Sequence, residues 1–216
     1  MTTYVAPRAP HGRVHSVAAS RPLTRWRVVD LVTLAVLGVA FGALFLAWQN
    51  VYVLATPLLA LFKPVEGLLS GLYFMPAVVG ALVVRRPGAA LFTELVAAFV
   101  EMALGNVWGA TVLVSGLMQG LGVELVVAVL LWRVWNVGVA IAAGIASGAL
   151  ELAGYEWWSY YADQPWSYRL SYLGFTALSA AVIAGLLGWV LVRALAATGA
   201  LVAFPPGIEH AERTRT

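Results

Sequence analysis

Long apolar runs, separated only by short polar or Gly/Pro junctions, set the strictest limit on how this chain can fold. The sequence of 216 residues is 62% hydrophobic and 11% charged, and a helix needs about 20 apolar residues to cross the hydrocarbon core of a bilayer. We therefore expect an all-α integral membrane protein with a bundle of six transmembrane helices. The expected helices cover residues 28–48, 66–84, 88–104, 109–132, 135–157 and 169–198.

The piece from Val51 to Phe62, in the first outer loop, is too short to span the bilayer. Pro57 lies inside it and Pro64 follows it, and proline interrupts helical hydrogen bonding. Irregular backbone is tolerated at membrane depth only where protein or a water-filled cavity covers it. We expect a broken or re-entrant helix that forms a wall or lid.

The basic residues are divided unequally between the two ends of the expected helices. Of the 13 Lys and Arg residues, all but Lys63 and Arg169 precede the first helix, follow the second or fourth, or come at or beyond the end of the last. By the positive-inside rule, both termini are expected in the cytoplasm, with an even number of passes through the cell membrane. The basic composition needs no nucleic-acid partner to explain it.

Two terminal segments differ in composition from the expected membrane domain, residues 26–198. Residues 1–25 contain Pro and Arg without the apolar core of a secretory signal, and residues 199–216 carry mixed charges. We expect both to be flexible and cytoplasmic. The chain has no Cys, and its three His residues lie in these segments, so an intramembrane metal centre or catalyst is not expected.

Five carboxylates lie inside or at the mouth of the apolar stretches. Ionisable groups are costly in a membrane, so their presence indicates a functional site. Acids that face one cavity with aromatic side chains nearby suit a small aromatic cation. The five residues are Glu66, Glu94, Glu101, Glu124 and Glu151.

Glu94 and Glu101 are seven residues apart, which puts them on nearly the same face of the third helix. Ala97 and Ala98 lie between them, leaving an open acidic surface for a planar ligand. The alternative is that the alanines allow close helix packing and that each Glu hydrogen-bonds a neighbour.

The fourth helix places Trp108, Ser115 and Gln119 on one face. Gln119 offers both a donor and an acceptor to the edge of a heterocycle. Glu124 lies about 140° away around the helix. It is expected either to contact the ligand or to pair with another helix.

Glu66 and Glu151 each lie toward the outer end of a stripe of small residues, on the second and fifth helices. Both are candidate ligand contacts, although Glu66 is close enough to the interface to be solvated or paired with Lys63. Most outer aromatics are typical of an interfacial belt. The aromatics best placed to line a pocket, with core packing as the alternative, are Trp48, Tyr73 and Trp108.

Small residues recur at four-residue spacing on the first helix, a pattern that lets helices approach closely. The stripe is expected either to pack internally or to dock a membrane partner. Its members are Ala35, Gly38, Gly42, Ala43 and Ala47.

Two segments carry a resemblance to a known family. Arg86-Pro87-Gly88-Ala89-Ala90 leads into Glu94 and Glu101, and Gln119-Gly120-Leu121-Gly122-Val123-Glu124 follows on the next helix. Over roughly residues 26–198, the chain resembles the YkoE family. These proteins are the substrate-capture S components of energy-coupling-factor (ECF) vitamin transporters, linked to thiamine or its hydroxymethylpyrimidine precursor.

The resemblance implies an outward-facing pocket for thiamine or hydroxymethylpyrimidine, closed by the first outer loop. It also implies docking, through the small residues of the first helix, to a transmembrane coupling (T) protein driven by two cytoplasmic ATPase subunits. The sequence contains no GxxxxGK[ST] phosphate-binding loop, so ATP is expected to be used by the partner subunits. No cofactor is expected in this chain.

Other interpretations stay open. An autonomous ion-coupled secondary transporter of a small organic cation would use the same acids as a relay, although we find no convincing inverted repeat. A membrane enzyme is disfavoured because no intramembrane His or Cys is present. A non-transport assembly protein would bind no small molecule.

Overall fold

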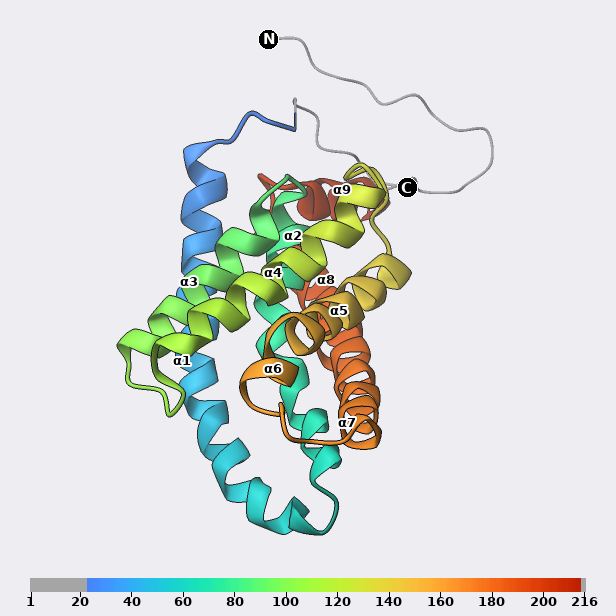
Figure 1. The fold of residues 1–216 in the computed structure, drawn as a ribbon. Helices are drawn as coiled ribbons and strands as arrows, with labels where there is room; N and C mark the ends of the chain where they lie inside the picture. The colour runs from blue at the N-terminus through green and yellow to red at the C-terminus, as the bar shows by residue number, and fades with distance from the viewer. Residues whose placement is uncertain (1–22, 215–216) are drawn as a thin grey trace.

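The computed structural model describes residues 23–214, and within this range the ordered elements are all helical (Figure 1). Most of the expected N-terminal arm, residues 1–22, lies outside the described residues. η1 is a 3₁₀ helix, and η3 and η4 are π-helical turns. The elements are α1 (Val28–Ala55), η1 (Thr56–Phe74), α2 (Met75–Val84), α3 (Ala89–Ala103), η2 (Gly109–Thr111), α4 (Val112–Val129), α5 (Val137–Glu151), η3 (Leu152–Glu156), α6 (Trp157–Ser159), α7 (Trp166–Ser179), η4 (Ala180–Leu187), α8 (Gly188–Ala197) and α9 (Pro205–Thr214).

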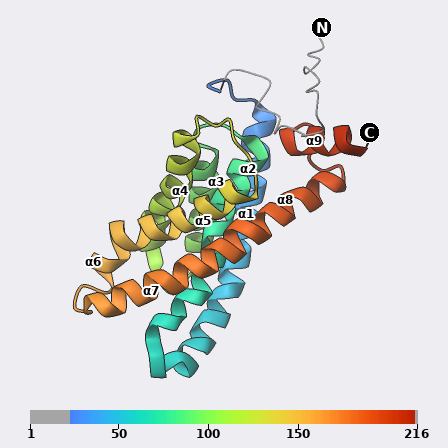
Figure 2. The same cartoon turned by 90° about the vertical axis from the view of Figure 1, so that its right-hand side faces the viewer.

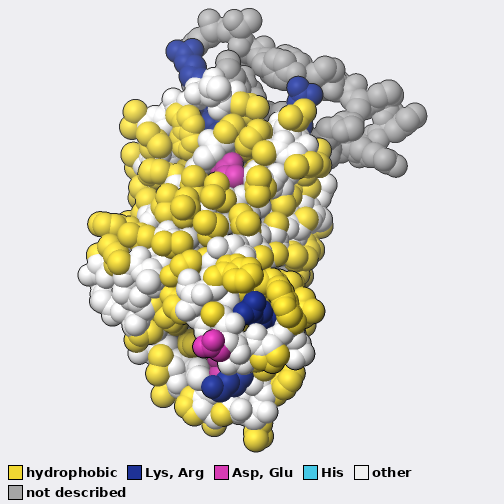
Figure 3. All heavy atoms as spheres, viewed as in Figure 1, with side chains coloured by type: hydrophobic (Ala, Val, Ile, Leu, Met, Phe, Trp, Pro, Cys, Tyr) yellow, Lys and Arg dark blue, Asp and Glu magenta, His cyan; other side chains and the backbone are white. Residues whose placement is uncertain are grey.

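Four helical segments of the described chain are long and apolar enough to cross a membrane. The first has 57 residues and folds back on itself, so that η1 and α2 lie beside α1 (Figures 1 and 2). Large apolar side chains are exposed along the bundle, and the face in Figure 3 is mostly hydrophobic. Soluble monomers do not expose apolar surface on this scale, so the chain is a multi-pass membrane protein. The four segments are Val28–Val84, Gly109–Val129, Val137–Ser159 and Trp166–Ala197.

Each of the six predicted ranges is helical over most of its length, but the segment between Val51 and Phe62 differs from the expectation. α1 continues to Ala55 and passes into η1, which breaks at Phe62 (φ −146°, ψ 78°). The turn projects beyond the other helices (Figure 1), and Leu61 is fully exposed. The helix is therefore broken, as one of the two expected alternatives describes, and the side chains next to the break are mostly exposed.

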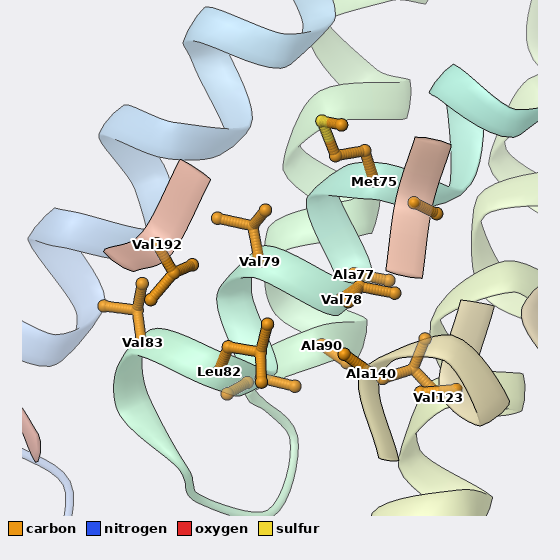
Figure 4. Packing of buried hydrophobic residues seen from close by; sticks show 14 of the residues in the cluster. Met75, Ala77, Val78, Val79, Leu82, Val83, Ala90, Val123, Ala140 and Val192 are labelled. Atoms are coloured by element: carbon orange, nitrogen blue, oxygen red, sulfur yellow. The ribbon is translucent and has the colours of Figure 1, made fainter. Parts of the chain in front are cut away.

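α2 forms the centre of the bundle. All of its residues from Met75 to Val84 are buried, as expected for a helix that is apolar on every face. Figure 4 shows its side chains packed against residues of four neighbouring helices. The labelled neighbours are Ala90 of α3, Val123 of α4, Ala140 of α5 and Val192 of α8.

Two glycines of the predicted docking stripe are enclosed between α1 and α3. A Cβ atom on Gly38 would lie 2.7 Å from Cβ of Val96, and one on Gly42 would lie 2.6 Å from the Ala97 carbonyl oxygen. Both glycines therefore serve internal packing, and the prediction that they dock a partner is wrong. The other members of the stripe stay at least partly exposed: Ala35, Ala43 and Ala47.

The C-terminal segment expected to be flexible instead forms α9, which packs against α2 and α8 at the end of the bundle where α1 begins. Glu209 of α9 is buried and accepts hydrogen bonds of 2.5 and 3.0 Å from the Arg85 guanidinium. Arg85 is itself buried and lies 5.5 Å from the ring centre of Trp135. The prediction of a flexible tail is wrong for α9, since a buried arginine needs a buried carboxylate partner.

The start of α1 adds further charged residues at this end of the bundle. The buried carboxylate of Asp30 accepts hydrogen bonds from the backbone amide of Arg27 (2.9 Å) and its Nε (2.8 Å). Nε of Arg86 is 3.6 Å from Asp30 Oδ2. We call the set Arg27, Asp30, Arg85, Arg86 and Glu209 the polar cluster at the α9 end.

Candidate functional site

A cavity of about 280 Å³ lies toward the α6 end of the bundle, away from α9. It is lined by residues of α1, η1, α3, α4, α5, η3 and α7 and of the turns that precede α4 and follow α6. Ten of its 17 lining residues are aromatic or apolar and seven are acidic or polar, a larger polar share than in a typical small-molecule site, where apolar and aromatic side chains predominate. The lining residues are Phe45, Tyr52, Ser70, Tyr73, Phe74, Glu94, Ala98, Glu101, Trp108, Val112, Ser115, Gln119, Glu151, Glu156, Tyr160, Tyr161 and Tyr172.

Four of the lining residues are carboxylates, and they differ in how they are bound. Oε2 of Glu94 accepts a hydrogen bond of 2.9 Å from the Ala77 amide. Glu151 is buried and lines the cavity beside the side chains of Gln119 and Ser115. Among the described residues, Oε1 of Glu94 and Oε1 of Glu101 have no hydrogen-bond partner, although both side chains are buried. The hydrogen-bonding capacity of these two oxygens is therefore not used within the described chain.

Aromatic rings form the outer wall of the cavity. The Trp108 ring meets the rings of Tyr52 and Tyr73 edge to face, with centroid distances of 5.7 and 5.9 Å. Phe45 extends the group, at 4.9 Å from Tyr73. Edge-to-face contacts hold such rings in fixed orientations, so their faces and edges present a preformed surface to a flat ligand.

The charge on the lining is of one sign. Among the described residues that line the cavity, four are Glu and none is Lys or Arg. A cation that enters would meet both uncompensated carboxylate oxygens and aromatic rings, which attract positive charge through their π faces. An anion would meet only repulsion from charged side chains.

Six of the nine predicted ligand contacts line this cavity; five come from four separate helical elements and the sixth, Trp108, from the turn before η2. The structure thus brings together side chains that are up to 78 positions apart in the sequence, from Tyr73 to Glu151. The six are Tyr73, Glu94, Glu101, Trp108, Gln119 and Glu151.

The other three predicted contacts lie outside the lining. Nε1 of Trp48 donates to the Leu69 carbonyl (2.8 Å). Glu66 is buried behind Tyr52, whose hydroxyl donates to it at 3.4 Å. Each side chain therefore supports the wall, and neither directly faces the cavity.

Glu124 is the third, and its role is structural. Its Oε1 accepts a hydrogen bond of 2.9 Å from the Ala90 amide, at the first turn of α3. The exposed amides at a helix N-terminus favour a negative charge. Of the alternatives left open by the sequence, pairing with another helix describes Glu124 and contact with the cavity does not.

Sequence reasoning missed Glu156 and the tyrosines that follow it. At 100° per residue, Glu156 would lie about 140° around the helix from Glu151, facing away from any shared site. The chain instead makes a π-helical turn over Leu152–Glu156, in which the Trp157 amide bonds the Leu152 carbonyl. The interfacial-belt interpretation covers Tyr160 and Tyr161, and Tyr172 is given no role by the sequence; all three line the cavity.

Comparisons with known proteins identify the class of transporter. A family model described as "ABC-type cobalt transport system, permease component" matches residues 29–150. A Bacillus subtilis (strain 168) protein, named as the HMP/thiamine permease protein YkoE, is 34% identical over 177 residues, covering 82% of this chain and 87% of that protein. A crystal structure of an S-component of an ECF transporter matches with a TM-score of 0.82 and 32% identity, covering 88% of this chain and 96% of that one.

The chain belongs to the YkoE family of ECF S components. It is a transporter component and not an enzyme. The fold match covers almost the whole of the solved S-component, and together with the sequence relative it identifies the chain as a substrate-binding S component. The predicted family and its all-helical membrane fold are confirmed.

Proposed function

We propose that this S component captures thiamine or its hydroxymethylpyrimidine precursor from outside the cell and delivers it to an ATPase-driven coupling module. The observation that carries the proposal is the cavity described above, which is lined by four carboxylates and several aromatic rings and, among the described residues, by no basic side chain. The name of the Bacillus subtilis relative, which mentions HMP and thiamine, supports the choice of ligand.

The charge of the cavity fits the thiazolium of thiamine. Two unit charges at about 4 Å attract by about 4 kcal/mol at an effective dielectric constant near 20, before desolvation is subtracted. Glu101 is placed to provide this attraction because its Oε1 is buried without a partner. Tyr73 and Trp108, which lie against one another beside it, provide the aromatic surface.

The deeper end of the cavity fits the aminopyrimidine, which thiamine and hydroxymethylpyrimidine share. An amino group and ring nitrogens need acceptors and donors in one plane. Oε1 of Glu94 has no hydrogen-bond partner among the described residues, and the Gln119 side chain on the same lining offers both a donor and an acceptor.

We also propose the topology that this function requires. Six passes through the cell membrane are assigned to α1, η1–α2, α3, η2–α4, α5–α6 and α7–α8, with the α9 end in the cytoplasm. The distribution of Lys and Arg supports this orientation. It places the cavity toward the outside, where a captured vitamin enters.

Delivery is assigned to partners: a transmembrane coupling protein and two cytoplasmic ATPase subunits that use ATP. The exposed small residues of α1, Ala43 and Ala47, are proposed as part of the docking surface because they allow close approach of another helix. Liposomes that contain the S component alone are expected to show no ATP-dependent uptake of labelled thiamine. Uptake by the chain alone under an ion gradient would instead support the ion-coupled carrier.

The direct test is titration of the detergent-purified protein with thiamine and with hydroxymethylpyrimidine. The chain has nine tryptophans, and Trp108 lines the cavity, so ligand entry is expected to quench tryptophan fluorescence. Calorimetry on the same samples gives the stoichiometry, expected to be one. Saturable binding of either compound supports the proposal, and no binding of either contradicts it.

A further inference from the structure

The π-helical turn after α5 places a fourth carboxylate, Glu156, on the lining of the cavity. In an α-helix the fifth residue after Glu151 would point to a different side. In a π turn the hydrogen bond runs from residue i to i+5, so that the fifth residue returns close to the position above the first. Single π turns are rare and occur frequently at functional sites.

Glu156 lies on a lining that is rich in tyrosine and, among the described residues, contains no basic side chain. Its Oε2 is buried without a hydrogen-bond partner among the described residues. The tyrosines on the same lining are Tyr52, Tyr73, Tyr160, Tyr161 and Tyr172.

Glu156 therefore differs from the other acids of the cavity. Oε2 of Glu94 is held by a backbone amide, and Glu151 lines the cavity with the polar side chains of Gln119 and Ser115, so these two belong to a polar end. Glu156 shares the lining with Tyr161 and Tyr172, whose rings lie 5.1 Å apart and are tilted at 56°. A carboxylate beside electron-rich rings suits a delocalised cation better than it suits a neutral hydrogen-bonding group.

We propose that Glu156 acts together with Glu101 in recognising the positive charge of thiamine, and so helps the site to distinguish thiamine from the uncharged hydroxymethylpyrimidine. The inference rests on the proposed function and adds to it a division of the cavity. The end of the cavity with Glu156 and its tyrosines binds the fixed positive charge. The end with Glu94, Gln119 and Glu151 binds the aminopyrimidine, which both compounds carry.

With the cavity divided in this way, the affinity for a charged ligand depends on Glu156 and the affinity for an uncharged ligand does not. Thiamine loses attraction to a full charge when the carboxylate becomes an amide, whereas hydroxymethylpyrimidine and a neutral thiophene analogue of thiamine have no charge to lose. The analogue has the size and shape of thiamine, so it separates the effect of charge from the effect of volume.

The experiment measures the affinity of three ligands, thiamine, hydroxymethylpyrimidine and the thiophene analogue, for the wild type and for three variants. Glu156→Gln removes the charge at nearly constant volume, and Glu156→Asp retains it. Asp163→Asn is the matched control, because Asp163 is an exposed acid of the same outer region that does not line the cavity. Thermal unfolding of each purified variant without ligand verifies that it is folded.

We expect Glu156→Gln to weaken thiamine binding by about tenfold or more. The affinities for the two uncharged ligands should change by less than about threefold, as should all affinities of Asp163→Asn. Glu156→Asp should keep the preference of the wild type for thiamine over its neutral analogue.

Three results would overturn the inference while the proposed function stands. The first is an equal loss for all three ligands in Glu156→Gln, which would make Glu156 a structural residue of the wall. The second is wild-type affinity for thiamine that persists in Glu156→Gln, and the third is a wild type that binds only hydroxymethylpyrimidine. If the wild type binds neither vitamin compound, the proposed function itself fails before any variant is measured.

Discussion

The polar cluster at the α9 end and the cavity near α6 both contain buried carboxylates, but the carboxylates have different partners in the two regions. At the α9 end, Glu209 is held by Arg85 through two hydrogen bonds and Asp30 lies among the arginines that precede α1 and follow α2. In the cavity, Glu101 and Glu156 keep oxygens without partners and no Lys or Arg lines the wall among the described residues.

Whether a buried carboxylate already has partners distinguishes structural acids from the proposed ligand-binding acids more clearly than its depth in the membrane does. A buried carboxylate that is fully paired has little left to offer a ligand, and removing its partner is costly. A buried carboxylate with a free oxygen is unfavourable for the empty protein and gains most when a cation or donor arrives. Glu124 shows that burial alone is misleading, since its oxygen is already bound to the Ala90 amide.

The largest expected effect on stability comes from breaking the paired region. Arg85→Ala leaves the buried Glu209 carboxylate without its bidentate partner, and loss of one member of a buried pair costs about 3–5 kcal/mol. Thermal unfolding in detergent should show a large drop for this variant. Thiamine affinity of the remaining folded protein should match that of the wild type; a large drop in affinity with no loss of stability would contradict the comparison.

The next largest effect is expected in the cavity, and on binding instead of stability. Glu101→Gln is expected to reduce thiamine affinity by about 100-fold, or about 2.7 kcal/mol. Its melting temperature should be unchanged or higher, because an unpaired buried charge is removed. Titration and thermal unfolding of the same preparation measure both quantities. Unchanged affinity would count heavily against Glu101 as a ligand contact.

A smaller effect, on stability, is expected for Glu124→Ala. This variant tests whether Glu124 belongs with the structural acids or with the ligand-binding acids. Loss of a carboxylate that accepts from a first-turn amide should cost about 1–2 kcal/mol of stability. Thiamine affinity should stay within about threefold of the wild type, because Glu124 is not part of the lining. A strong loss of affinity with normal stability would move Glu124 into the binding site.

The sequence was sufficient for the helices and for most of the acid residues that line the cavity. Helical periodicity places Glu94 and Glu101 on one face, and the structure has both on the cavity. The failures have a common physical origin, because they depend on tertiary contacts that no single helix reveals. Glu209 of α9 pairs with the buried Arg85. Gly38 and Gly42 are enclosed by α3, and Glu124 accepts a hydrogen bond from the Ala90 amide at the start of α3.

Glu156 was missed for a different reason. The calculation of helix faces assumes 100° per residue, and the π turn over Leu152–Glu156 changes that angle locally. A sequence gives little warning of such a turn, since the residues on either side are ordinary for a membrane helix. The proposed charge-recognition residue is therefore found only once the backbone is known.

The turn between α2 and α3 has a mechanical consequence. Its two adjacent arginines reach opposite ends of the chain, Arg85 to Glu209 in α9 and Arg86 to Asp30 in α1. Arg27 also donates directly to the Ala203 carbonyl at 3.1 Å, across 176 positions. These contacts join the start of α1 and the C-terminal segment of the described chain to the α2–α3 turn. A pulling force applied to both ends of the described chain would act on these contacts first. The helices around the cavity would come under tension only after the contacts had broken.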